Sequence, residues 1–259
     1  MAEKLKYFVN GQFRESKTDK WYDLHNPSTG EITGQAPCCT NDEVLEAIAA
    51  AKAAYPGWSA TPAIKRAQIL YRVRELILER MDELTMSVAK ENGKVWAESE
   101  GDVLKAKEGT ELATQVPSLM MGESIMDASR GYDTVKYREP LGVFAGIVPV
   151  NFPAMIPFGW MAPTCIAAGN TLVLKAASLT PKTAMLFAQL YKDAGVPDGV
   201  INVVTCSRNE INTILEHPDV KGITFVGSTP VGLKIYEKAA ANGKRCQALC
   251  QAKNHALVM

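Results

Sequence analysis

Short apolar runs alternate with helical runs over the second half of the chain, and this alternation constrains the fold more than any other feature. The runs typical of strands cover residues 142–148, 171–174, 200–204, 222–226 and 255–259, with a weaker candidate at 244–249. Helical patterns lie between them, at residues 153–168, 181–193, 209–216 and 230–241. Strands that alternate with helices form right-handed βαβ units, in which helices cover a parallel sheet. The sequence therefore predicts an α/β fold with a Rossmann-like parallel sheet covered by helices.

The segment between Glu139 and Lys175 carries no charged residue and is long enough to span a bilayer. Prolines interrupt it at positions 149, 153, 157 and 163. Because proline removes backbone donors, one continuous membrane helix is disfavoured. Two buried strands with a turn and a helix between them explain the segment better, so we expect no membrane partner.

The first half of the chain carries helical patterns and turn signals. Asn10-Gly11 between apolar residues predicts a tight hairpin, and Thr40 with Glu43 three residues later predicts a capping box. Helices are expected at residues 41–55, where Pro56-Gly57 would stop the first, and from Thr61-Pro62 to about Val116, with a break at Asn92-Gly93.

Residues 125–138 differ in character from the segments on either side, because two polar, extended runs flank Gly131-Tyr132. We expect a β arm that leaves the body of the domain and mediates oligomerisation. The predicted organisation is an N-terminal part of the domain in residues 1–124, with a small β element and a helical layer, then the arm in 125–138 and a Rossmann-like part of the domain in 139–259.

Charge and cysteine content exclude several classes of protein. The 28 basic and 28 acidic side chains give zero net charge, whereas nucleic-acid-binding proteins usually show a basic excess. The six cysteines lack paired spacings, and the spacing of Cys246, Cys250 and His255 is no recognised zinc pattern. The chain does not open like a secretory signal. We expect a cytoplasmic protein without a metal or a nucleic-acid partner.

Ligands of parallel sheets bind beyond the carboxyl ends of the strands, which directs attention to Gly227 and Ser228. The segment from Gly227 to Lys234 nearly matches an ATPase phosphate loop, but Leu233 occupies the place of the required lysine. A glycine and a serine at the start of a helix can still hold a pyrophosphate, because helix N-termini carry partial positive charge. An ordinary strand-to-helix turn explains the same residues equally well.

Two more polar residues follow predicted strands. The amide of Asn151 could donate to a developing oxyanion, or Asn151 could simply begin a turn before Pro153. Lys175 could bind a ribose or a phosphate, or it could be the first solvated residue after a buried strand. The residues alone leave both alternatives open.

Several segments of the chain resemble the aldehyde dehydrogenase family. In chain order they are residues 26–31 (NPSTGE), 91–94 (ENGK), 139–153 (EPLGVFAGIVPVNFP), 168–175 (AGNTLVLK), 195–204 (GVPDGVINVV) and 225–229 (FVGST). The resemblance implies NAD(P)-dependent oxidation of an aldehyde, with Asn151 as the oxyanion-hole amide. It also implies a set of cofactor-binding residues, namely Val148, Val150, Lys175, Ser178, Gly227, Ser228, Leu249 and Cys250.

Within this family the chain resembles the CoA-acylating methylmalonate-semialdehyde dehydrogenases, through residues 117–122 (PSLMMG) and 252–255 (AKNH). Hydrolytic relatives carry a glutamate that activates water where this chain has Leu249. A leucine cannot accept a proton, so the resemblance implies transfer of the acyl group to CoA. The substrate would be a short semialdehyde, with Lys105 at the place of an arginine that binds its carboxylate.

The chain departs from the family pattern in two ways. Ser178 replaces a glutamate that binds the adenosine ribose, so NADP is an alternative to NAD. The family's nucleophilic cysteine lies beyond the AKNH segment, and none of the six cysteines aligns with it. We therefore expect a homo-oligomeric cofactor-binding portion that lacks the catalytic domain and is inactive alone. The alternatives are a noncatalytic nucleotide-binding fragment and another aldehyde dehydrogenase subgroup.

Overall fold

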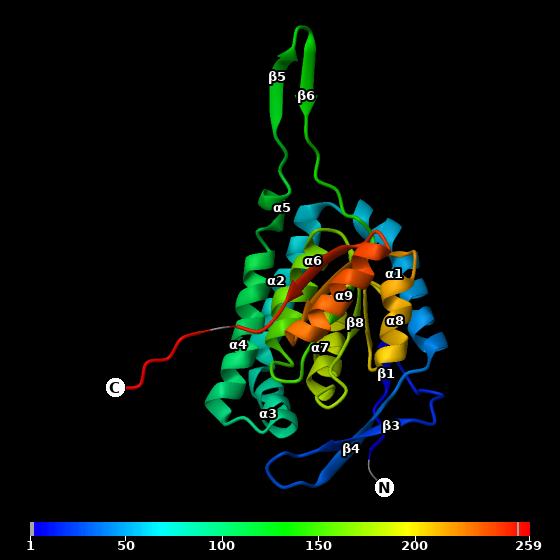
Figure 1. Cartoon of the computed structure of the whole chain (residues 1–259). Coiled ribbons are helices and arrows are strands. Elements are labelled where there is room, and N and C mark those ends of the chain that lie inside the picture. Colours follow the sequence, from blue (N-terminus) through cyan, green and yellow to red (C-terminus); the bar gives the residue numbers. More distant parts are fainter. Residues whose placement is uncertain (1–2, 253) are drawn as a thin grey trace.

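A seven-stranded sheet forms the centre of the molecule, in a computed structural model that describes residues 3–252 and 254–259 (Figure 1). The strand order is β11-β10-β7-β8-β9-β1-β2. The first five strands in this order are parallel, whereas β1 is antiparallel to both β9 and β2. The strands are β1 (Tyr7–Val9), β2 (Gln12–Arg14), β7 (Val143–Ile147), β8 (Thr171–Lys175), β9 (Ile201–Val204), β10 (Val220–Val226) and β11 (Arg245–Leu249). The predicted α/β fold with a helix-covered parallel sheet is confirmed.

Helices cover both faces of the sheet because strand side chains alternate between them. In β8, Leu172 and Leu174 belong to one core cluster, and Val173 belongs to the other. The cluster around Val173 packs against α1 (Asn41–Ala60), α8 (Arg208–Glu216) and α9 (Thr229–Ala241). The cluster around Leu172 packs against α2 (Ala63–Glu79), α4 (Trp96–Ala113) and α7 (Lys182–Asp193).

The N-terminal helical layer also contains α3 (Met81–Asn92) and the short α5 (Val116–Leu119). Thr40 and Glu43 form the predicted capping box at the start of α1. Gly93 ends α3 in the left-handed conformation, with φ of 73°. A separate two-stranded sheet of β3 (Trp21–His25) and β4 (Ile32–Pro37) lies near the N-terminus. The predicted helical layer is therefore present, with the break at Asn92-Gly93 that the sequence indicated and a further break at Arg80 that it did not.

The predicted arm is a hairpin of β5 (Ser124–Ser129) and β6 (Tyr132–Val135) that projects far from the body of the molecule (Figure 1). Every residue of both strands is exposed. This geometry leaves apolar side chains such as Ile125 and Val135 open to solvent.

Three expectations about individual elements need correction, in the end of one helix, the first turn of another and the presence of one strand. Helix α1 continues through Pro56 to Ala60, because Trp58 is buried and donates its indole N–H to the carbonyl of Ile166 at 3.0 Å. The helix expected at residues 153–168 begins as a π-helical turn, η1 (Ile156–Met161), and continues as α6 (Ala162–Ala167). The described residues 254–259 are exposed and form no strand, because no neighbouring strand supplies hydrogen bonds there.

Among the described residues, no helix combines the length and the apolar character that a bilayer-spanning segment needs. The charge-free segment instead supplies β7, η1, α6 and β8 to the core.

Candidate cofactor site at the carboxyl edge of the sheet

The loops that follow the parallel strands meet at one edge of the sheet. The register pairs Ile147 with Lys175, Lys175 with Val204, and Val226 with Leu249, so these strands end level with one another. The chain runs outward from β7 to β8 and β9 and then returns to β10 on the other side of β7. Such a reversal opens a crevice at the carboxyl ends, which is where open α/β sheets bind ligands.

The side chain of Lys175 is half-buried at the end of β8. Burial lowers the pKa of this lysine, and the groups that oppose the shift are the thiols of Cys206 and Cys38 rather than a carboxylate. A partly desolvated ammonium without a carboxylate beside it is suited to a ligand hydroxyl or phosphate. Ser178, three residues later, is also half-buried at this edge.

The N-terminus of α9 follows β10 directly, after Gly227 and Ser228. Ser228 occupies the capping position, but its side chain forms no capping hydrogen bond with any described residue. By contrast, Thr40 with Glu43 caps α1, and Ser207 with Glu210 caps α8. Pro230 has no N–H, and the N–H groups of Val231 and Gly232 donate to the carbonyl of Ser228. Among the described residues this leaves the N–H groups of Ser228 and Thr229, together with the helix dipole, to meet an anion.

Asn151 is exposed in the loop after β7, between the exposed Val150 and the half-buried Phe152. The carbonyl of Val150 accepts hydrogen bonds from Asn92 Nδ2 at 2.7 Å and from Thr180 Oγ1 at 3.2 Å. Val148, in contrast, is buried, so only its backbone edge is available to a ligand. The loop that carries Asn151 is thus held by two separate segments while the amide itself remains accessible.

Leu249 ends β11 at the same edge and Cys250 follows it directly, and both are exposed. The thiol of Cys250 lies against Gly232 in α9. Leu249 and the preceding Ala248 have no titratable group, so neither can act as the general base that glutamate would be at this place.

Lys105 lies on α4, and its exposed ammonium forms an ion pair with Glu108 at 2.6 Å. Its backbone packs against Gly159 of η1, where a Cβ atom would come within 2.9 Å of the Lys105 carbonyl oxygen. The structure therefore places Lys105 beside η1, and its role towards a substrate stays a prediction.

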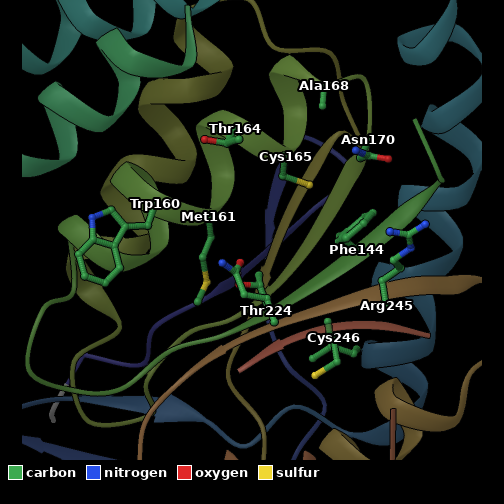
Figure 2. Close-up of a pocket in the computed structure, with 12 residues that line it drawn as sticks. Phe144, Trp160, Met161, Thr164, Cys165, Ala168, Asn170, Thr224, Arg245 and Cys246 are labelled. Carbon is green, nitrogen blue, oxygen red and sulfur yellow. The ribbon is translucent and has the colours of Figure 1, made fainter. Parts of the chain in front are cut away.

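A cavity of about 370 Å³ lies between η1, α6 and the strands β7, β10 and β11 (Figure 2). Phe144, Trp160, Met161 and Thr224 line it, whereas the thiol of Cys246 points away (Figure 2). Sequence reasoning did not single out these residues. The charge-free stretch that contains Trp160 and Met161 was the signal that could have found them.

The thiols near the sheet are poor nucleophiles. Burial raises the pKa of Cys39 and Cys206 to about 12, and it also raises the pKa of Cys165 and Cys246. A nucleophilic cysteine needs a lowered pKa, because the thiolate is the reactive form. In the part of the chain that the structure describes, no group of three His, Cys, Asp or Glu side chains could hold a metal ion.

Comparison with known proteins decides the family. The family model described as the aldehyde dehydrogenase family matches residues 13–259. This chain belongs to the aldehyde dehydrogenase family. The relationship predicted from the sequence motifs is therefore confirmed.

Aldehyde dehydrogenase relatives match the chain over nearly its full length. Malonate-semialdehyde dehydrogenase 2 of Geobacillus kaustophilus is 46% identical over 258 residues, which are 100% of this chain and 53% of the relative. The mitochondrial acylating methylmalonate-semialdehyde/malonate-semialdehyde dehydrogenase of Rattus norvegicus is 45% identical over 255 residues, or 98% of this chain and 48% of the relative. The chain thus spans about half the length of the curated relatives it matches.

A solved structure from Sinorhizobium meliloti 1021, assigned as a methylmalonate-semialdehyde dehydrogenase and complexed with NAD, superposes with a TM-score of 0.96. It is 36% identical, and the match covers 98% of this chain and 52% of that chain. The fold of this chain is therefore that of an aldehyde dehydrogenase.

Proposed function

We propose that this chain binds NAD, or NADP, at the carboxyl edge of its sheet as the cofactor-binding part of a CoA-acylating semialdehyde dehydrogenase. The observation that carries the proposal is the meeting of Lys175, the α9 N-terminus and Asn151 at one edge of a sheet whose strand order reverses there. The names of the relatives, which are malonate- and methylmalonate-semialdehyde dehydrogenases, support the reaction class.

The residues at this edge fit a dinucleotide. Lys175 and Ser178 would hold the adenosine ribose, and the backbone N–H groups of Ser228 and Thr229 would hold the pyrophosphate. Val148 and Val150 would border the crevice on the β7 side, with Leu249 and Cys250 on the β11 side. NAD, when bound, supplies the hydride acceptor for the oxidation of an aldehyde.

The chemical roles follow from the same positions. Asn151 would donate its amide N–H to the oxyanion that develops on the aldehyde carbonyl. The family attacks the aldehyde with a cysteine thiolate, and the buried thiols of this chain are held protonated. We therefore expect the chain alone to reduce no NAD in the presence of a semialdehyde. Turnover that disappears when one of the six cysteines is replaced would contradict this expectation.

The absence of a base at Leu249 favours transfer of the acyl group to CoA. Hydrolysis needs a general base near the attacking water, whereas a thiol ionises by a few per cent at neutral pH and needs less assistance. A longer polypeptide that joins this chain to a catalytic part should yield acyl-CoA, identified by mass. Leu249→Glu should raise the fraction of free acid, and a wild-type product that is mainly free acid would refute the acylating assignment.

Calorimetric titration with NAD tests the binding proposal directly. Lys175→Ala should weaken binding about tenfold, which corresponds to about 1.4 kcal/mol for one lost contact. Lys52→Ala removes an equal charge from the opposite edge, where Lys52 pairs with Asp219 at 2.8 Å, and should leave the affinity unchanged. Equal affinity for wild type and Lys175→Ala would place the cofactor elsewhere.

A further inference from the structure

We infer that Asn92, Lys94 and Asp102 act together as positioning residues for Asn151, by clamping the loop of residues 150–155 from the α3–α4 junction. The three residues are called the α3–α4 clamp below, and residues 150–155 are called the asparagine loop. The inference rests on the proposed function, in which Asn151 donates to an oxyanion. It goes beyond that function by naming the residues that fix where the donor points.

The clamp holds the asparagine loop on the N-terminal side of Asn151. Asn92 Nδ2 donates to the carbonyl oxygen of Val150 at 2.7 Å. Thr180 Oγ1, from the segment after β8, donates to the same oxygen at 3.2 Å. Two donors from separate parts of the chain thus fix the peptide group that joins Val150 to Asn151.

The clamp also holds the residue directly after Asn151. The ammonium of Lys94 lies over the ring of Phe152, 4.1 Å from its centroid. A cation at this distance from an aromatic face is attracted by the ring quadrupole, and the attraction is stronger when the cation is desolvated. Only 17% of the Lys94 side chain is exposed, so water competes weakly for this contact.

Asp102 joins the lysine to the far end of the asparagine loop. Its Oδ2 pairs with Lys94 Nζ at 3.0 Å, and its Oδ1 accepts from the backbone N–H of Met155 at 2.7 Å. The Asp102 side chain is fully buried, and burial raises the pKa of its carboxyl, which these two partners oppose. A buried carboxylate needs such partners, so Lys94 and Met155 cannot move away independently.

Gly93 makes this arrangement feasible. Its φ of 73° turns the chain between Asn92 and Lys94, so that both side chains reach the asparagine loop. A Cβ atom at Gly93 would come within 2.6 Å of Pro27 Cγ. The contacts therefore flank Asn151 on both sides while the residue itself stays exposed. A donor on a loop is useful only when its neighbours fix its direction, because small misplacements cost much of the rate.

The test uses the side-chain amide of Asn151 as a spectroscopic reporter in this chain. Its ¹H–¹⁵N resonances are assigned by their loss in Asn151→Ala. Lys94→Met and Asp102→Asn should shift these resonances or split them into several sets. Lys94→Arg preserves the charge and the aromatic contact, and should keep the single wild-type set.

Lys107→Met is the matched control. Lys107 is also on α4, is 19% exposed and pairs with Glu111 at 3.1 Å. The Lys107→Met substitution should leave the Asn151 resonances unchanged. If Lys94→Met does not fold, Asn92→Ala removes a half-buried side chain and should produce the same shift.

Unchanged Asn151 resonances in folded Lys94→Met and Asp102→Asn, or an equal change in Lys107→Met, would overturn the inference. The result is separable from the proposed function, because a failure to bind NAD would leave this reporter unaffected.

Discussion

The thiol of Cys250 lies so close to Gly232 that a Cβ atom at position 232 would come within 2.4 Å of its sulfur. The two residues lie in the segment after β11 and in the first half of α9, so the contact fixes how these elements pack at the proposed cofactor edge. It also explains a glycine inside a helix, where alanine would normally be more stable by about 0.5–1 kcal/mol.

Gly232→Ala should therefore destabilise the wild-type chain by about 1 kcal/mol or more, because overpacking exceeds the gain in helix propensity. Cys250→Ala removes the sulfur, so the same substitution should cost less in that background. Urea unfolding of the four variants in a double-mutant cycle measures the difference. Additive effects would show that the sulfur does not restrict position 232.

Ser178 should determine how well the chain tolerates NADP. A carboxylate beside the adenosine ribose repels a 2′-phosphate, so Ser178→Glu should raise the ratio of NADP to NAD dissociation constants about tenfold. Ser178→Gln has a similar size without the charge and serves as the control. Calorimetric titration with both cofactors measures the ratio. An equal rise in the glutamine variant would show that size, and not charge, discriminates.

Stability should fall with rising pH because of Glu91, whose carboxylate accepts from the backbone N–H groups of Lys182 at 2.8 Å and Thr183 at 3.0 Å. Burial raises the pKa of Glu91 from about 4.5 to about 7. Between these values the folded chain binds more protons than the unfolded chain, so the stabilisation present below about 4.5 is lost as pH rises through 7.

Glu91→Gln removes this titration. The free energy of unfolding of wild type relative to the variant should fall by up to about 1.4 kcal/mol per pH unit in that window. Urea unfolding at several pH values measures it. A constant difference between the two proteins from pH 4.5 to 7 would contradict the assignment.

The arm should drive self-association, because both strands are exposed and their edges are unpaired by the described residues. Ile125→Lys with Val135→Lys should lower the mass measured by light scattering. Ile64→Lys is the control, because Ile64 on α2 is 65% exposed and Ile125 is 62% exposed. Ile64→Lys should not lower the mass. A monomeric wild type would refute the expectation.

Local signals predicted the elements where neighbouring residues decide the structure. The Asn10-Gly11 turn and the Thr40–Glu43 capping box each need only a few adjacent residues. The prediction that α1 stops at Pro56 failed because the burial of Trp58, which hydrogen-bonds to Ile166, outweighs the cost of the backbone donor that proline lacks. Residues 255–259 have the composition of a strand, but a strand also needs a partner.

The candidate site could be predicted in part. The rule that ligands bind beyond the carboxyl ends of parallel strands directs attention to Lys175, Ser178 and Gly227 from the sequence alone. The contacts between the α3–α4 clamp and the asparagine loop join residues more than 50 positions apart, such as Asn92 to Val150 and Asp102 to Met155. Hydrophobic periodicity carries no information about such pairs, so only the three-dimensional structure reveals them.

Mapping the NAD contact surface by NMR tests the central claim most directly. Backbone amide resonances would be followed in the wild-type chain during titration with NAD. The account predicts shifts concentrated after β7, β8 and β10, at Asn151, Lys175–Ser178 and Gly227–Ser228. Shifts confined to another surface, such as the cavity beside Trp160 and Met161, would contradict it, as would no shift at saturating NAD.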